Sequence, residues 1–154
     1  MQVFLSHSGR DRKVATAIRD RLTPTGVRWY LAEHDPRPGE VLSKKVQAAI
    51  EKSDLVVLLL TPNSYDSAYV HQEVGYAIRA GKLVVPLVDR SVPAGALAML
   101  EGAEYIALDN EAPEAALRSL EEFLQRRAST KELEEFLLLL LAVVLLVLVF
   151  SPSR

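Results

Sequence analysis

The sequence contains no cysteine, and its three histidines, His7, His34 and His71, stand far apart. Without cysteine the chain has no disulfide framework, no thiolate chemistry, no cysteine zinc site and no iron–sulfur cluster. The histidines show none of the short intervals that metal-ligand motifs use. We therefore expect no metal centre.

Concentrated positive charge is also missing. The 18 Lys and Arg residues are scattered along the chain and are outnumbered by 20 Asp and Glu residues, for a formal charge of −2. A protein that binds nucleic acid by neutralising phosphates needs a basic patch or run, so no nucleic-acid partner is expected. The Gly-x-Gly-x-x-Gly and Walker phosphate loops are absent as well.

What the sequence does contain is a regular alternation of short apolar runs and longer amphipathic stretches. The run 54–60 is almost entirely apolar, which is typical of a parallel strand covered on both faces. The alternation predicts an α/β, flavodoxin-like fold with five parallel strands and helices on both faces. The expected strands are 2–6, 27–31, 54–60, 83–88 and 104–108, and the expected helices are 10–22, one containing Leu42 to Ile50, 67–80, 94–101 and 113–127.

Apolar periodicity also predicts which side of each helix is buried. In the first helix the predicted inner face is Val14, Ala17, Ile18 and Leu22. In the helix after the third strand it is Val70, Val74, Ala77 and Ile78.

The C-terminal part of the sequence is different in kind. After a domain at 1–127, residues 128–135 form a polar linker, and residues 136–150 are fifteen consecutive apolar residues. As a helix this run spans about 22 Å, against a hydrocarbon core of roughly 30 Å. Basic residues precede it, and no secretion signal opens the chain, so we expect a cytoplasmic domain with a single-pass tail anchor. The alternative is an assembly helix buried in a soluble cytoplasmic oligomer.

Polar residues gather where the predicted strands end, at 6–11, 32–39 and 61–67. Ligands of open α/β sheets bind at that edge. Glu73 borders the apolar face of its helix, one turn after Tyr69, where a carboxylate can stabilise a cationic group. From spacing alone, however, Glu73 can equally be a solvated surface residue. Residues 6–8 can likewise be a turn that caps the next helix, and 32–39 a plain connection.

Three segments carry a family resemblance. Residues 3–8, Val-Phe-Leu-Ser-His-Ser, with Asp11 after them, match a first box; His34 to Gly39 match a BB loop; and Leu60 to Glu73, Leu-Thr-Pro-Asn-Ser-Tyr-Asp-Ser-Ala-Tyr-Val-His-Gln-Glu, match a third box. In this order and spacing, residues 1–127, some 80% of the chain, resemble a Toll/interleukin receptor (TIR) domain. The family's usual tryptophan four residues before the glutamate is Tyr69 here.

The resemblance implies a function and a site. Some family members cleave nicotinamide from NAD+ in immune signalling, as glycohydrolases or cyclases, with NAD+ as substrate and no added cofactor. By resemblance Glu73 is catalytic; Ser6, His7 and Ser8 line the phosphate or ribose side; Tyr69 faces the nicotinamide; Asp35 and Ser67 bind substrate; and Pro36, Arg37, Pro38 and Gly39 form a lid that a neighbouring copy completes. Homo-oligomers of TIR domains are therefore expected.

Two other functions stay open at this point. Other members of the family are non-catalytic adaptors, which would use the loop at Pro38 and Gly39 to recruit further TIR domains beneath a membrane. A third hypothesis makes the apolar tail the effector, which permeabilises a membrane when the domains cluster.

Overall fold

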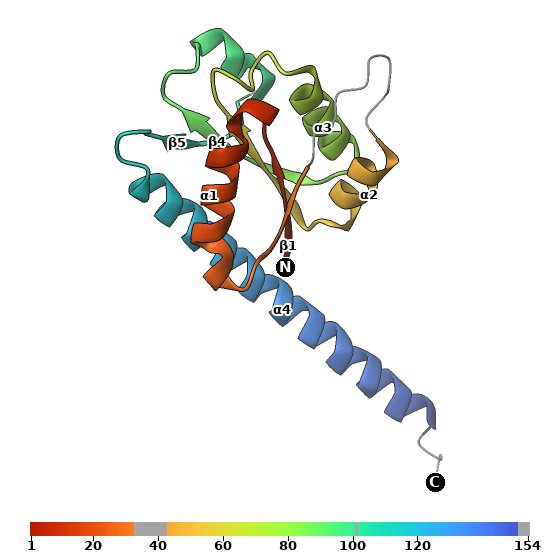
Figure 1. Ribbon diagram of the computed structural model, residues 1–154. Coiled ribbons are helices and arrows are strands. Elements are labelled where there is room, and N and C mark those ends of the chain that lie inside the picture. The colour runs from red at the N-terminus through yellow and green to blue at the C-terminus, as the bar shows by residue number, and fades with distance from the viewer. Residues whose placement is uncertain (33–42, 101, 151–154) are drawn as a thin grey trace.

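A single parallel sheet forms the centre of the protein (Figure 1). The computed structural model describes residues 1–32, 43–100 and 102–150, with side chains for all of these except 97–99 and 143–150. The sheet has the order β2-β1-β3-β4-β5, and every neighbouring pair is parallel, which confirms the predicted five-stranded architecture. Its strands are β1 (Gln2–Ser6), β2 (Arg28–Leu31), β3 (Leu55–Leu60), β4 (Leu83–Asp89) and β5 (Ile106–Leu108).

Helices cover both faces of the sheet. Side chains of α1 and α4 pack with Val3, Leu5 and Leu55 on one face, whereas α2 and α3 pack with Phe4 and Val56 on the other. All six residues of β3 are fully buried, because its alternating side chains enter both layers. The helices are η1 (Gly9–Asp11), α1 (Arg12–Leu22), η2 (Thr23–Thr25), α2 (Lys44–Lys52), α3 (Ala68–Arg79), η3 (Ala94–Leu100) and α4 (Glu114–Phe150).

Three residues predicted to face the core, Val14, Ala17 and Ile78, are exposed instead. Val14 is 43% exposed and Ile78 is 58% exposed. The inner positions of α1 are Ala15, Ile18 and Leu22. At about 100° per residue, Val14 lies at the edge of this stripe and Ala17 on the far side of it. On α3, Ala77 takes the inner position, and Ile78 is turned outward by the same rotation.

Helix α4 runs without a break through residues 128–135, which the composition marks as a polar linker. Its first turns pack on the domain, where Leu117, Leu120 and Leu124 are buried. Farther on it extends past the domain (Figure 1), and its apolar residues from Leu133 to Leu141 are each 51–67% exposed. Within the described part of the chain no helix is long and apolar enough to cross a membrane, so the predicted tail anchor is not supported.

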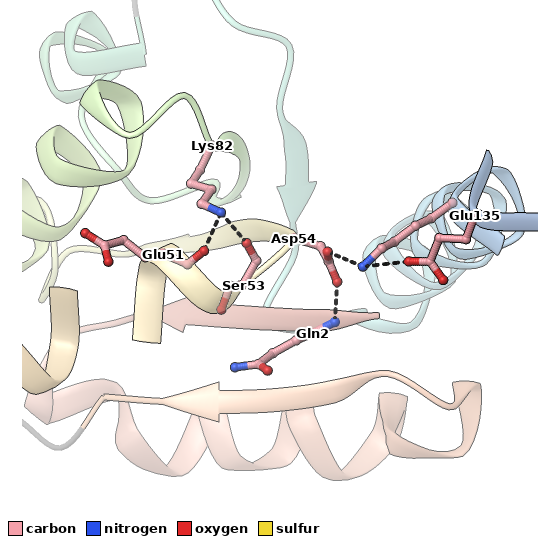
Figure 2. Close-up of polar contacts among 7 residues, drawn as sticks. Gln2, Glu51, Ser53, Asp54, Lys82 and Glu135 are labelled. Carbon is pink, nitrogen blue, oxygen red and sulfur yellow. Dashed lines mark hydrogen bonds and ion pairs between the residues drawn. The ribbon is translucent and has the colours of Figure 1, made fainter. Parts of the chain in front are cut away.

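A polar cluster at the amino-terminal edge of the sheet attaches α4 to the domain (Figure 2). Asp54, just before β3, accepts hydrogen bonds from the backbone N of Gln2 at 2.7 Å and from Lys131 Nζ at 2.5 Å. Lys131 also pairs with Glu135 at 3.6 Å. Nearby, Lys82 Nζ donates to the backbone oxygens at the end of α2, the end that carries partial negative charge.

Candidate active site at the carboxyl ends of β1 and β3

The strand order places a crevice at the opposite edge of the sheet. From β1 the chain moves to one side to form β2 and then returns to the other side for β3, so the topology switches between β1 and β3. Open α/β sheets bind ligands at such switch points, beyond the carboxyl ends of the strands. Ser6 ends β1 and Thr61 follows β3 at this edge.

Helix α3 brings Glu73 to the switch point. The Ser67 side chain accepts a hydrogen bond from the backbone N of Val70 at 3.4 Å and so caps the helix start. In the second turn Glu73 then points inward beside Val70 and Val74, with none of its surface exposed. The alternative of a solvated surface glutamate is therefore wrong.

The environment of Glu73 favours its neutral form. Ser6 Oγ donates a hydrogen bond to Glu73 Oε2 at 2.6 Å. Burial raises the pKa of Glu73 to about 8, although the hydrogen bond from Ser6 acts to lower it. Near pH 7 this carboxyl group is mostly protonated in the structure described here. A strongly perturbed acid beside a cleft at a switch point is typical of a functional site.

A second buried carboxylate, Asp11, joins the two loops of the site. Its Oδ2 accepts hydrogen bonds from Ser8 Oγ at 2.8 Å and from Thr61 Oγ1 at 2.7 Å, and its Oδ1 accepts one from Asn63 Nδ2 at 2.8 Å. Ser64 fixes the same turn, because its hydroxyl accepts from the backbone N of Thr61 at 2.7 Å and donates to the carbonyl of Leu59 at 2.9 Å. The loop after β1 is thus fastened to the loop after β3.

A cleft of about 400 Å³ opens above these loops. The structure brings three predicted substrate-binding residues, Ser8, Ser67 and Tyr69, to its wall. Tyr69 lies one turn before Glu73 on α3, so the cleft and the buried carboxyl group share one helix face. The remaining lining residues are Gly9, Arg10, Asn63 and Asp66.

The predicted trio at the end of β1 is divided among three environments. Ser6 contacts Glu73, and Ser8 contacts Asp11 and the cleft. His7 is 1% exposed, its Nδ1 lies 3.1 Å from the carbonyl of Leu5, and it lines a separate cavity of about 280 Å³ that also contains Trp29. Alternation of side chains at the end of a strand accounts for the separation of His7 from the two serines. His34, Asp35, Pro36, Arg37, Pro38 and Gly39 lie outside the described residues.

Sequence reasoning did not assign Asp11, Asn63 or Asp66 to the site. All three lie in the polar segments that follow β1 and β3, and the rule that ligands bind at strand ends is the signal that points to them. The contacts of Asp11 with Thr61 and Asn63 join residues some fifty positions apart in the chain. Among the described residues, no three His, Asp or Glu side chains are grouped as metal ligands would be.

Comparison with known proteins gives a family match over most of the chain. The family model described as "TIR domain" matches residues 3–121. A relative from Brachypodium distachyon, described as a probable 2′ cyclic ADP-D-ribose synthase (BdTIR), is 30% identical over 122 residues, which cover 76% of this chain and 54% of the relative. The chain thus spans about half the length of that relative.

Solved structures show the same fold at lower identity. The TIR domain of the Toll-related receptor TRR-2 from Hydra magnipapillata superposes with a TM-score of 0.61 at 18% identity, covering 80% of this chain and 97% of that one. A chain of the RPS4 and RRS1 TIR domain heterodimer gives a TM-score of 0.63 at 15% identity, and the match covers 82% of this chain and 97% of that one. At these identities the likeness concerns the fold alone.

Proposed function

This chain belongs to the TIR domain family, and from that premise we propose that it cleaves the bond between nicotinamide and ribose in NAD+. The observation that carries the proposal is a fully buried glutamate, Glu73, at the switch point of the sheet and one helical turn from a residue of the cleft. The name of the Brachypodium distachyon relative, a probable synthase of a cyclic ADP-ribose, supports the same substrate class.

The chemistry needs one well-placed acidic group. When nicotinamide departs, positive charge develops on the ribose, and a nearby carboxylate stabilises the transition state more than the ground state. The attraction is stronger in a site from which water is excluded than in bulk solvent. The leaving group is a neutral pyridine, so no general acid has to protonate it.

Substrate charge accounts for the ionisation of Glu73. In the structure burial keeps its pKa at about 8. The nicotinamide ring of NAD+ is cationic, and an opposite charge within a few ångströms lowers the pKa of a carboxyl group. Below pH 8, binding of NAD+ therefore favours release of a proton from Glu73, so that the carboxylate forms next to the cation that it stabilises.

Access to Glu73 requires a local rearrangement, since its side chain has no exposed surface. One contact that must change is the hydrogen bond from Ser6 to Glu73. Ser6 lies two residues before Ser8, which lines the cleft. We propose that assembly with other TIR domains favours the open arrangement, which would couple NAD+ cleavage to immune signalling. The product is either ADP-ribose or a cyclic isomer.

The direct test measures free nicotinamide after incubation of the purified full chain with NAD+, over a series of protein concentrations. Release is expected to rise more steeply than protein concentration, and Glu73→Gln should reduce it at least a hundredfold. Glu104→Gln, a matched change at an exposed position before β5, should leave it unchanged. Equal release by the Glu73→Gln and Glu104→Gln proteins would remove Glu73 from the mechanism.

One observation favours a second function, that of a non-catalytic interaction module. The complete burial of Glu73 against Ser6 is also what a purely structural contact would require. That function predicts no nicotinamide release at any protein concentration, together with retained binding to other TIR domains when Glu73 is replaced by Gln.

A further inference from the structure

The cleft wall formed by Ser8 and Asn63 has a defined hydrogen-bond polarity. A carboxylate only accepts hydrogen bonds, so the contacts of Asp11 fix the direction of both neighbours. The single hydroxyl hydrogen of Ser8 points to Asp11 Oδ2, which leaves the lone pairs of Ser8 Oγ for other partners. Asn63 turns its Nδ2 toward Asp11 Oδ1, so its carbonyl oxygen and its second N–H remain for other partners. Both residues line the cleft.

The charges around the cleft act in the same direction. Among the residues that line it, the formal charges of Arg10 and Asp66 cancel. The carboxylate of Asp11 accepts hydrogen bonds from Ser8 and Asn63 and adds negative charge next to them. The phosphate groups of a dinucleotide are anionic and offer only acceptors, so the acceptor atoms and the negative charge of Asp11 disfavour them at this wall, while Arg10 lines another part of the cleft. A neutral group with two hydroxyl donors matches the wall.

We propose that Asp11 orients Ser8 and Asn63 so that they accept hydrogen bonds from the vicinal diol of a ribose, and that this wall discriminates against phosphate. The proposal rests on the proposed function and specifies which part of the substrate the cleft holds. One carboxylate fixes both acceptors, so a single diol can donate to both. Because Tyr69 lines the cleft one turn before Glu73, the diol in question is that of the ribose whose bond is cleaved.

The test is a set of binding titrations in the Glu73→Gln background, which keeps the ligands intact. The probes are nicotinamide riboside, its 2′,3′-dideoxy analogue and inorganic phosphate. Two neutral hydrogen bonds, at about fivefold each, correspond to a preference for the riboside of about 25-fold. Inorganic phosphate should not compete with the riboside. Equal affinity for the two nucleosides, or competition by phosphate, would overturn the proposal.

Variants separate positioning from general stability. Asp11→Asn supplies an amide donor in place of an acceptor, lets both neighbours reorient and should reduce the preference to near unity. Asp89→Asn is the matched control, because Asp89 is also buried and accepts hydrogen bonds from a serine and an asparagine, Ser91 and Asn110, but at the end of β4. It should keep the preference. An equal loss in the Asp89→Asn protein would assign the Asp11 effect to stability alone.

A second variant covers the case in which Asp11→Asn fails to fold. Asn63 is exposed, so Asn63→Ala should fold and should lower the preference about fivefold, the share of one hydrogen bond. An unchanged preference in this variant contradicts the proposal. Nicotinamide release by the unsubstituted chain is measured in parallel. Release without diol preference would reject the proposal and keep the proposed function, whereas diol preference without release would do the reverse.

Discussion

The pKa of a carboxyl group is shifted in opposite directions at the two edges of the sheet, downward for Asp54 and upward for Glu73. At the amino-terminal edge, burial alone would raise the pKa of Asp54, but hydrogen bonds from Lys131 and the backbone of Gln2 outweigh it and lower the pKa. At the carboxyl-terminal edge, Glu73 has the neutral hydroxyl of Ser6 as its hydrogen-bond donor, and burial raises its pKa to about 8. The first carboxylate is compensated by a cation, while the second is held in its neutral form.

Under the proposed function, this difference separates a structural carboxylate, Asp54, from a reactive carboxyl group, Glu73. A carboxylate that already has a cationic partner stabilises the fold and has little left to offer a ligand. A carboxyl group whose pKa is raised by burial costs stability when it ionises, and a cationic ligand can recover that cost. The contrast can be tested by changing either carboxyl group or its partner.

The largest expected effect is on the pH dependence of stability. The folded-state pKa of Glu73 lies above its ordinary value of 4.5, so its favourable contribution is fully present below pH 4.5 and is lost as the pH rises to about 8. The slope is about 1.4 kcal/mol per pH unit within that window. Urea unfolding of the unsubstituted chain and of Glu73→Gln, compared at pH 5 and pH 8, should give the substituted protein a smaller loss. Parallel curves for the two proteins would show that Glu73 is not buried in its neutral form in solution.

The next effect concerns catalysis. The pH dependence of kcat/KM reports ionisations of the free enzyme. If the carboxylate of Glu73 is the active form, kcat/KM should rise about tenfold per pH unit from pH 6 and level off near pH 8, where the pKa of Glu73 lies. Initial rates of nicotinamide release across this range provide the measurement. A flat profile would mean that another group controls the reaction.

A smaller shift should follow from Ser6→Ala, which removes the hydrogen bond to Glu73 Oε2. That bond acts to lower the pKa of Glu73, so its loss should move the rising limb of kcat/KM to higher pH. The stability at pH 5 should fall by about 1 kcal/mol. The pH profile distinguishes this role from simple packing, since a packing defect would lower the rates without displacing the limb.

Much of the fold could be predicted because apolar runs are local signals. The fully buried strand β3 and the strand β1 follow directly from such runs. The continuity of helix α4 through residues 128–135 could not be predicted, because a polar composition is typical of linkers. Side-chain pairs one turn apart, such as Lys131 with Glu135, support a continuous helix there.

The site was only partly predictable, for a related reason. Family resemblance predicts Glu73 as a catalytic residue, and that role stays a prediction. The burial of Glu73 depends on how α3 is rotated against the sheet, and helical spacing near the edge of an apolar stripe does not determine that rotation. The contacts of Asp11 with Thr61 and Asn63 join segments some fifty residues apart. Such contacts appear only after the two strands are placed side by side.

The smallest expected effect lies at the amino-terminal edge, where Lys131→Met removes the cationic partner of Asp54. The side chains of Asp54 and Lys131 are 25% and 42% exposed, so solvent screens the pair, and the cost in stability should be about 1 kcal/mol or less at pH 7. Arg126→Met, which removes a more exposed ion pair on the same helix, is the matched control and should cost less.

Hydrogen exchange should show faster opening of α4 near residue 131 in the Lys131→Met protein only. Nicotinamide release per folded molecule should be unchanged, because this edge contributes to the fold and not to the site. A loss of nicotinamide release per folded molecule in the Lys131→Met protein would show that the two edges are coupled and that the contrast between them does not hold.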